Sequence, residues 1–226
     1  MSNKPYPAYK PSGVEWLGDV PEHWEVTRIK FIFPRLYSGV SVNSNAVTSD
    51  QDSIGVLKTS CVYGNRFSPE ENKQVIEEET DRVSCPVTKN SVIISRMNTP
   101  ELVGNCGYVE LNYPNLFLPD RLWIARFEKH NEMFGKFAWY LISSDTTVKL
   151  TGVLATGTSG SMKNLSQDSF LNIAIAVPPP PNSMPLPHFS TARLDTLTRL
   201  SPKRRNCFPC WPNSAPPSFP AQSPKG

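Results

Sequence analysis

Three polar loops carry the residues of this sequence that are best suited to binding chemistry. They are KTSCVYGNRF at 58–67, SRMNTPELVGN at 95–105 and TGTSGSMKN at 156–164. Basic, amide and hydroxyl side chains contact phosphate oxygens and base edges in DNA, with arginine suited to guanine and asparagine to adenine. These three loops are therefore candidates for contact with DNA. The simpler interpretation, that such loops only face water, stays open at this point.

The sequence contains no motif that predicts catalysis, a metal site or a cofactor. The glycines between 152 and 160 lack the Gly-Lys-Ser/Thr ending of a phosphate-binding loop. Cys207 and Cys210 form a Cys-x-x-Cys pair, but no second ligand pair follows to complete a zinc site. We therefore expect a non-catalytic protein without a cofactor.

Composition divides the chain near Pro178. Of the 23 prolines, 13 lie in 178–226, where six basic residues face a single acid. Residues 1–177 hold 17 basic and 19 acidic residues, a net charge of −2, so the positive total belongs to the tail. This deficit opposes phosphate binding by the body of the chain, unless a partner supplies basic surface.

The odd number of cysteines and the absence of an export signal indicate reduced thiols and a cytoplasmic protein. The sequence contains no run of 18 apolar residues, so it predicts no membrane span.

Short strands and a few helices must position the polar loops, which predicts an α+β fold. Runs rich in β-branched and aromatic residues predict strands at 27–33, 53–64, 91–97, 121–128 and 171–177. Helical spacing of apolar residues predicts a helix at 131–143, and a short helix or turn is expected at 163–170. We assign to the core Trp16, Trp24, Trp123 and Trp139.

The segment YPAYKPSGVEWLGDVPEHWEVTRIK at 6–30 closely resembles the N-terminal signature of type I restriction-modification specificity subunits. The resemblance continues through 55–75, 91–110, 115–127 and GTSGSMKNLSQDSFLNIAIAVPPPP at 157–181. It implies that 1–181 is a DNA target recognition domain of mixed α+β structure. It also implies double-stranded DNA as a partner, together with the methylation and restriction subunits of the complex. Loop position together with this resemblance gives as candidate DNA-binding residues Lys58, Ser60, Arg96, Asn98, Ser159, Lys163 and Asn164. In this family methyl transfer and cleavage reside in those partner chains.

The chain departs from the family after the proline run at 178–181. Its length suits one recognition domain where two are expected, and the usual helical spacer is replaced by a proline-rich tail that cannot be helical. Codons can be chosen for 181–191 that encode EQHAIAAFLD when read from the third nucleotide. The same shift converts 201–226 into AEKTELLSLLAEQRAALISRAVTKG, a proline-free amphipathic helix.

We therefore expect that the reading frame has slipped, and that 182–226 is a degenerate, mostly disordered remnant of the helical spacer. Loss of that helix is expected to impair docking to methylation subunits, and it argues against pairing between half-length subunits.

An alternative function is a β-rich module that binds protein, with the prolines at 178–181 as a ligand for proline-reading domains and no role on DNA.

Overall fold

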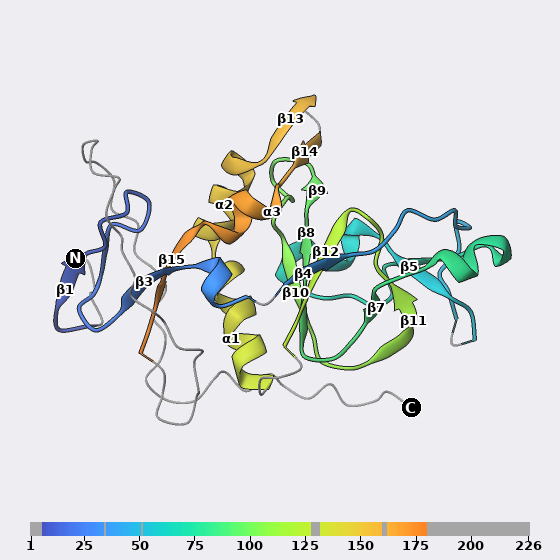
Figure 1. Cartoon of the computed structure of the whole chain (residues 1–226), viewed down its shortest axis with the longest axis horizontal. Coiled ribbons are helices and arrows are strands. Elements are labelled where there is room, and N and C mark those ends of the chain that lie inside the picture. The colour runs from blue at the N-terminus through green and yellow to red at the C-terminus, as the bar shows by residue number, and fades with distance from the viewer. Residues whose placement is uncertain (1–5, 34, 51, 128–131, 160–161, 180–226) are drawn as a thin grey trace.

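The computed structural model describes residues 6–179, except 34, 51, 128–131 and 160–161. Short strands and helices alternate along the chain, which confirms the predicted α+β class (Figure 1). The strands are β1 (Tyr9–Pro11), β2 (Asp19–Pro21), β3 (Glu25–Arg28), β4 (Leu36–Ser38), β5 (Gly55–Leu57), β6 (Asn72–Gln74), β7 (Pro86–Val87), β8 (Ser91–Ser95), β9 (Met97–Asn98), β10 (Cys106–Val109), β11 (Tyr113–Phe117), β12 (Leu122–Arg126), β13 (Thr156–Ser159), β14 (Met162–Asn164) and β15 (Ala174–Val177). The helices are α1 (Glu132–Ile142), α2 (Asp145–Leu154), α3 (Gln167–Leu171) and the 3₁₀ segments η1 (Ile29–Phe31), η2 (Thr59–Asn65) and η3 (Glu77–Arg82). No helix in these ranges is long and apolar enough to cross a bilayer.

The central sheet has the strand order β10-β8-β12-β4, and every neighbouring pair is antiparallel. Its middle strand β8 carries three consecutive apolar residues, Val92, Ile93 and Ile94, all with no exposed surface. An unbroken apolar run is what a strand covered on both faces requires. The central sheet therefore separates two hydrophobic clusters and forms the centre of the molecule.

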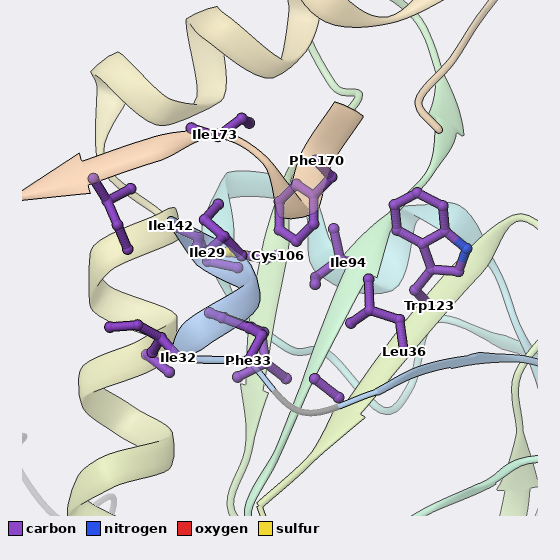
Figure 2. Packing of buried hydrophobic residues seen from close by; sticks show 14 of the residues in the cluster. Ile29, Ile32, Phe33, Leu36, Ile94, Cys106, Trp123, Ile142, Phe170 and Ile173 are labelled. Carbon is purple, nitrogen blue, oxygen red and sulfur yellow. The ribbon is translucent and has the colours of Figure 1, made fainter. Parts of the chain in front are cut away.

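The larger cluster lies between the central sheet and the helices. Ile94, Trp123 and Leu36 from the sheet meet side chains from η1, α1 and α3 in this layer (Figure 2). The helical side of the cluster includes Ile29, Ile32, Phe33, Ile142, Phe170 and Ile173.

The smaller cluster lies on the opposite face of the central sheet. Ile93 and Ile124 point into it and meet Leu57, Val62 and Leu116. These partners belong to η2 and to a second sheet of order β6-β5-β11-β7, in which β5 and β11 are parallel.

The N-terminal segment forms a small unit of its own. β1 pairs with β2, and β3 pairs with β15 from the far end of the described chain. Leu17, Val20, Trp24 and Ala176 form its buried cluster.

The assignment of tryptophans to the core is confirmed for Trp24 and Trp123, which are 6% and 2% exposed, while Trp139 packs against the larger cluster. It is wrong for Trp16, which is 40% exposed. Trp16 lies in the turn between β1 and β2, where its indole nitrogen donates to the carbonyl of Ala174 at 3.4 Å. The ring therefore covers the edge of β15 from outside.

The predicted strand at 27–33 is wrong after Arg28. The amide of Ile29 still donates to Ile173, but the chain then turns into η1. This turn brings Ile29, Ile32 and Phe33 together into the larger cluster, whereas a strand would direct alternate residues to opposite faces.

The predicted strand at 53–64 is likewise shorter than expected, because β5 ends at Leu57 and η2 follows. The 3₁₀ turn buries the consecutive residues Cys61 and Val62, which an alternating strand could not place on one face. The predicted helix at 131–143 corresponds to α1, and the predicted strands at 91–97, 121–128 and 171–177 correspond to β8, β12 and β15. Helix α2 was not predicted. The tail at 182–226, and therefore the predicted boundary at 181, lies outside the described residues.

Candidate nucleic-acid interface

A three-stranded sheet of order β13-β14-β9 collects most of the candidate residues, and we call it the tip sheet. Lys163 pairs with Asn98, Asn164 with Met97, and Ser159 with Met162. β13 and β14 extend beyond α2 and α3 at the top of the molecule (Figure 1). Residues from two loops, 95–105 and 156–164, thus lie in one small sheet, and the consecutive strand residues Lys163 and Asn164 point to its opposite faces.

A glycine allows β13 and β14 to approach each other in the tip sheet. A Cβ added to Gly157 in β13 would lie 2.3 Å from the carbonyl oxygen of Met162. Such a distance is too short for any side chain, so this close approach of the two strands requires glycine.

Arg96 lies beside the tip sheet and is held at several points. Its Nε donates to Oδ1 of Asn164 at 3.4 Å, and its guanidinium lies 5.7 Å from the ring centre of Trp123. Its amide donates to the carbonyl of Arg121, and its carbonyl accepts from the amide of Leu165. Arg96 therefore connects the central sheet to the tip sheet.

Asn98 is part of the framework of this surface. It is 6% exposed, its Nδ2 donates to Ser95 Oγ at 3.3 Å, and its Oδ1 accepts from the amide of Thr99 at 2.9 Å. The same Nδ2 lies 3.5 Å from the hydroxyl of Tyr63, which brings the 40% exposed ring of η2 to the tip sheet. The amide of Asn98 is thus occupied within the protein.

Lys58 and Ser60 lie on a neighbouring segment and share a carboxylate. The Lys58 ammonium is 3.2 Å from Glu71 Oε2, and the Ser60 hydroxyl donates a short hydrogen bond to the same oxygen. These two hydrogen bonds, that of Ser60 more strongly, lower the pKa of Glu71. The structure therefore places Arg96, Asn98, Lys163 and Asn164, with the backbone of Ser159, in or beside the tip sheet and leaves Lys58 and Ser60 with Glu71.

Charge is distributed unevenly between the tip sheet and the rest of the molecule. Among the described residues the ion pairs are Lys58–Glu71, Arg82–Glu79 and Lys136–Glu110, so neither Arg96 nor Lys163 has a carboxylate within 4.0 Å. Residues 50–82 hold eight acidic and four basic residues, a net of −4, which leaves +2 for the remainder of 1–177. The acidic segment η3 lies at the right-hand end in Figure 1, away from β13 and β14.

Sequence reasoning missed two residues that this arrangement involves. Arg121 is exposed beside Arg96, and Tyr63 reaches the tip sheet through Asn98. In the sequence, Arg121 stands at the start of the predicted strand at 121–128, where it could equally be structural, and Tyr63 lies in the polar loop at 58–67. Their neighbours come from distant segments, which the sequence does not show. Arg126, by contrast, donates to the carbonyl of Pro86 at 2.9 Å and joins β12 to β7.

The described residues do not assemble a metal centre. They include no group of three or more His, Cys, Asp or Glu side chains that could hold a metal ion. Burial raises the pKa of Cys61 and Cys106, which keeps both thiols protonated and poorly nucleophilic.

Comparison with known proteins gives a specific relative. No protein-family model matches the chain. Over 163 residues, 71% of the chain, it is 26% identical to the specificity subunit of the type I restriction enzyme EcoEI from Escherichia coli, of which the match covers 27%. The match thus spans about a quarter of that protein's length.

Two solved structures are also similar to this one. The type I restriction-modification S subunit from M. genitalium gives a TM-score of 0.42 at 17% identity, covering 68% of this chain and 34% of that one. The HsdS subunit from Thermoanaerobacter tengcongensis gives a TM-score of 0.43 at 16% identity, covering 72% and 35%. The sequence match confirms the resemblance seen in the motifs between 6 and 181, since most of the chain is similar in sequence to a specificity subunit of a type I restriction enzyme.

Proposed function

We propose that this chain is a sequence-specific DNA-binding subunit of a type I restriction-modification system. It directs partner methylation and restriction subunits to one half of a bipartite DNA site, and methyl transfer and cleavage belong to those partners. The EcoEI relative, named as a specificity subunit, supports this role.

The observation that carries the proposal is that candidate DNA-binding residues from distant segments meet at the tip sheet. Arg96, Lys163 and Asn164 come from segments more than 60 residues apart, yet they meet at one small sheet, where Lys163 and Asn164 point to opposite faces and neither cation has a carboxylate within 4.0 Å in the described part of the chain. A cationic surface that also carries amide groups suits both phosphates and base edges.

The net charge of −2 over residues 1–177 is compatible with this function. The acidic excess lies within 50–82, and its η3 segment is remote from the tip sheet (Figure 1). A local cationic surface is sufficient for contact with a few phosphates, and a partner's basic surface adds the rest of the affinity.

Fluorescence anisotropy of labelled duplex DNA tests the proposal. Affinity should fall linearly with the logarithm of salt concentration, because binding releases counterions from the phosphates. A protein-binding module with no DNA role would show no such dependence. If neither the full chain nor its complex with the cognate methylation subunit binds duplex DNA at low salt, the proposal is wrong.

A further inference from the structure

We propose that Arg96 reads a guanine in the recognised half-site, with Asn164 and Trp123 as positioning residues. The inference rests on the proposed DNA-binding function and adds the identity of a base and the side chain that selects it. Both the backbone and the side chain of Arg96 are held in a way that suits this task.

The backbone of Arg96 is fixed on both sides. Its amide donates to the carbonyl of Arg121 at 3.1 Å, and its carbonyl accepts from the amide of Leu165 at 2.8 Å. Leu165 has no exposed surface, so one of these two neighbours belongs to the core. The Cα of Arg96 is therefore placed as firmly as the end of the central sheet.

The side chain is fixed as well. Asn164 Oδ1 accepts from Nε, and the guanidinium lies over the indole of Trp123, which is 2% exposed. A buried ring cannot move aside, so it defines the position of the guanidinium above it. Arginine loses much rotamer entropy when it binds, and a side chain already held in place avoids part of that cost.

The end of the guanidinium remains available. Since Nε is engaged by Asn164, the two terminal nitrogens are left, and they have no hydrogen-bond or ion-pair partner within the described residues. They are also not among the buried polar atoms that lack a partner. A planar pair of donors in this arrangement matches two acceptors side by side, which O6 and N7 of guanine present in the major groove.

The other candidates at the tip sheet are less suited to selecting a base. The amide of Asn98 is buried and occupied by Ser95 and Thr99. Asn164 uses its Oδ1 on Arg96, and Lys163 offers a point charge without a preferred plane. A phosphate could accept the same arginine fork, so the experiment must separate a base contact from a backbone contact.

The full-length chain is incubated with a duplex library that contains a randomised segment, and the bound fraction is sequenced. Wild type should enrich a motif that includes at least one invariant G. Replacing that G by A should weaken binding roughly 5- to 150-fold, the range for one bidentate contact. Replacing it by 7-deazaguanine, which lacks the N7 acceptor, should weaken binding as well.

The variant Arg96→Lys keeps the charge but lacks the planar fork, and should lose the preference for G at that position. Arg121→Ala is the matched control, because Arg121 is an exposed neighbouring arginine whose side chain has no hydrogen bond in the described structure. It should weaken binding to all sequences alike. Asn164→Ala should reduce the preference, and Asn164→Asp, whose carboxylate also accepts from Nε, should restore it. Thermal unfolding of each variant checks that the fold is retained.

The possible failures are distinguishable. If wild type selects a motif and Arg96→Lys selects the same motif with the same preference, Arg96 does not read a base. If the variant weakens all sequences uniformly, or 7-deazaguanine is tolerated at every G, the contact is to phosphate and the inference is wrong. If wild type binds no duplex DNA at all, the proposed function fails and takes this inference with it.

Discussion

We expect different tasks for Lys163 and Arg96 in DNA binding, although both are cations without a carboxylate within 4.0 Å in the described structure. Arg96 is held by Asn164 and Trp123, whereas Lys163 pairs with Asn98 through the strand backbone and its side chain has no ion pair within the described residues. A fixed planar group can select a base, and a flexible point charge can follow a phosphate. We therefore expect affinity without selectivity from Lys163.

The variant Lys163→Ala should weaken DNA binding about equally for all sequences and reduce the salt slope by about 1. The measurement is anisotropy at several salt concentrations. Lys89→Ala is the control, because Lys89 lies near Ser91, at the end of β8 opposite Arg96. An equal loss in both variants would mean that the tip sheet is not the site of contact.

Glu71 offers a pH test of the Lys58 and Ser60 network. Hydrogen bonds from Ser60 and Lys58 lower the pKa of Glu71, so the folded state favours its ionised form. The resulting stability is present above the pKa of Glu71 in the unfolded chain and is lost as pH falls through the lower folded pKa. Because the side chains of Lys58 and Glu71 are 35% and 39% exposed, solvent screens the contribution.

Urea unfolding of wild type and Glu71→Gln at pH 7 and pH 3 should show a small advantage of wild type at pH 7 that shrinks at pH 3. A difference that stays constant between the two pH values would contradict the assigned ionisation.

At the scale of elements, the tip sheet depends on strand approach and the core depends on α1. Gly157 permits β13 to lie close to β14, and α1 places Phe134, Phe137 and Ile142 against the central sheet. The two structures have separate roles, because the tip sheet carries polar side chains and α1 carries apolar ones. Binding and stability should therefore respond to different substitutions.

Gly157→Val should abolish DNA binding while leaving most of the fold intact, because its Cβ would collide with the carbonyl of Met162 and separate β13 from β14. Circular dichroism and thermal unfolding monitor the fold, and anisotropy monitors binding. Undiminished binding with a native unfolding temperature would show that this strand pair does not contribute to the interface.

Phe134→Ala should lower the free energy of unfolding by about 3–5 kcal/mol, since Phe134 is 1% exposed and packs edge-on against Phe127. Met133→Ala, one residue earlier in α1, should cost less than about 1 kcal/mol, because Met133 is 48% exposed. Chemical denaturation measures both. Similar losses in the two variants would contradict the orientation of α1.

At the scale of the whole molecule, a strand near the start of the described chain pairs with a strand near its end. β3 and β15 pair although more than 140 residues separate them, and Val177 is the last residue of that sheet before the proline run. The end of the described chain is thus anchored next to the N-terminal unit. A helical spacer that followed 181 would leave the domain from this point.

We propose that the segment 182–226 is the frame-shifted remnant of such a spacer. Sequencing the gene should reveal codons that encode EQHAIAAFLD and AEKTELLSLLAEQRAALISRAVTKG in the shifted frame. The chain with the frame restored should co-purify with its methylation subunit, and the chain as written should not. Incompatible codons, or equal recovery of both forms with the methylation subunit, would refute the proposal.

Local patterns in the sequence were sufficient to predict the strands and the helix whose apolar residues follow the clearest periodicity. The run at 92–94 predicts a strand inside the protein, and the spacing of Phe134, Phe137 and Ala138 predicts α1, because periodicity reflects burial directly. The motifs between 6 and 181 similarly indicated the resemblance to type I specificity subunits, because they are long and compositionally unusual. Helix α2 was not predicted because its stretch DTTVKLTGVL has β-branched residues and a weak apolar face. Packing near α1 and the N-cap of Ser144 stabilise this helix.

Only the tertiary structure decided which polar residues lie next to one another. The sequence alone offered seven candidates in three loops of equal standing. Strand pairing brought Asn98 beside Lys163 and Arg96 beside Asn164, while Lys58 and Ser60 turned to Glu71. The reason is that hydrogen bonds between distant segments depend on how sheets and helices pack, and residue type and local spacing carry no information about that arrangement.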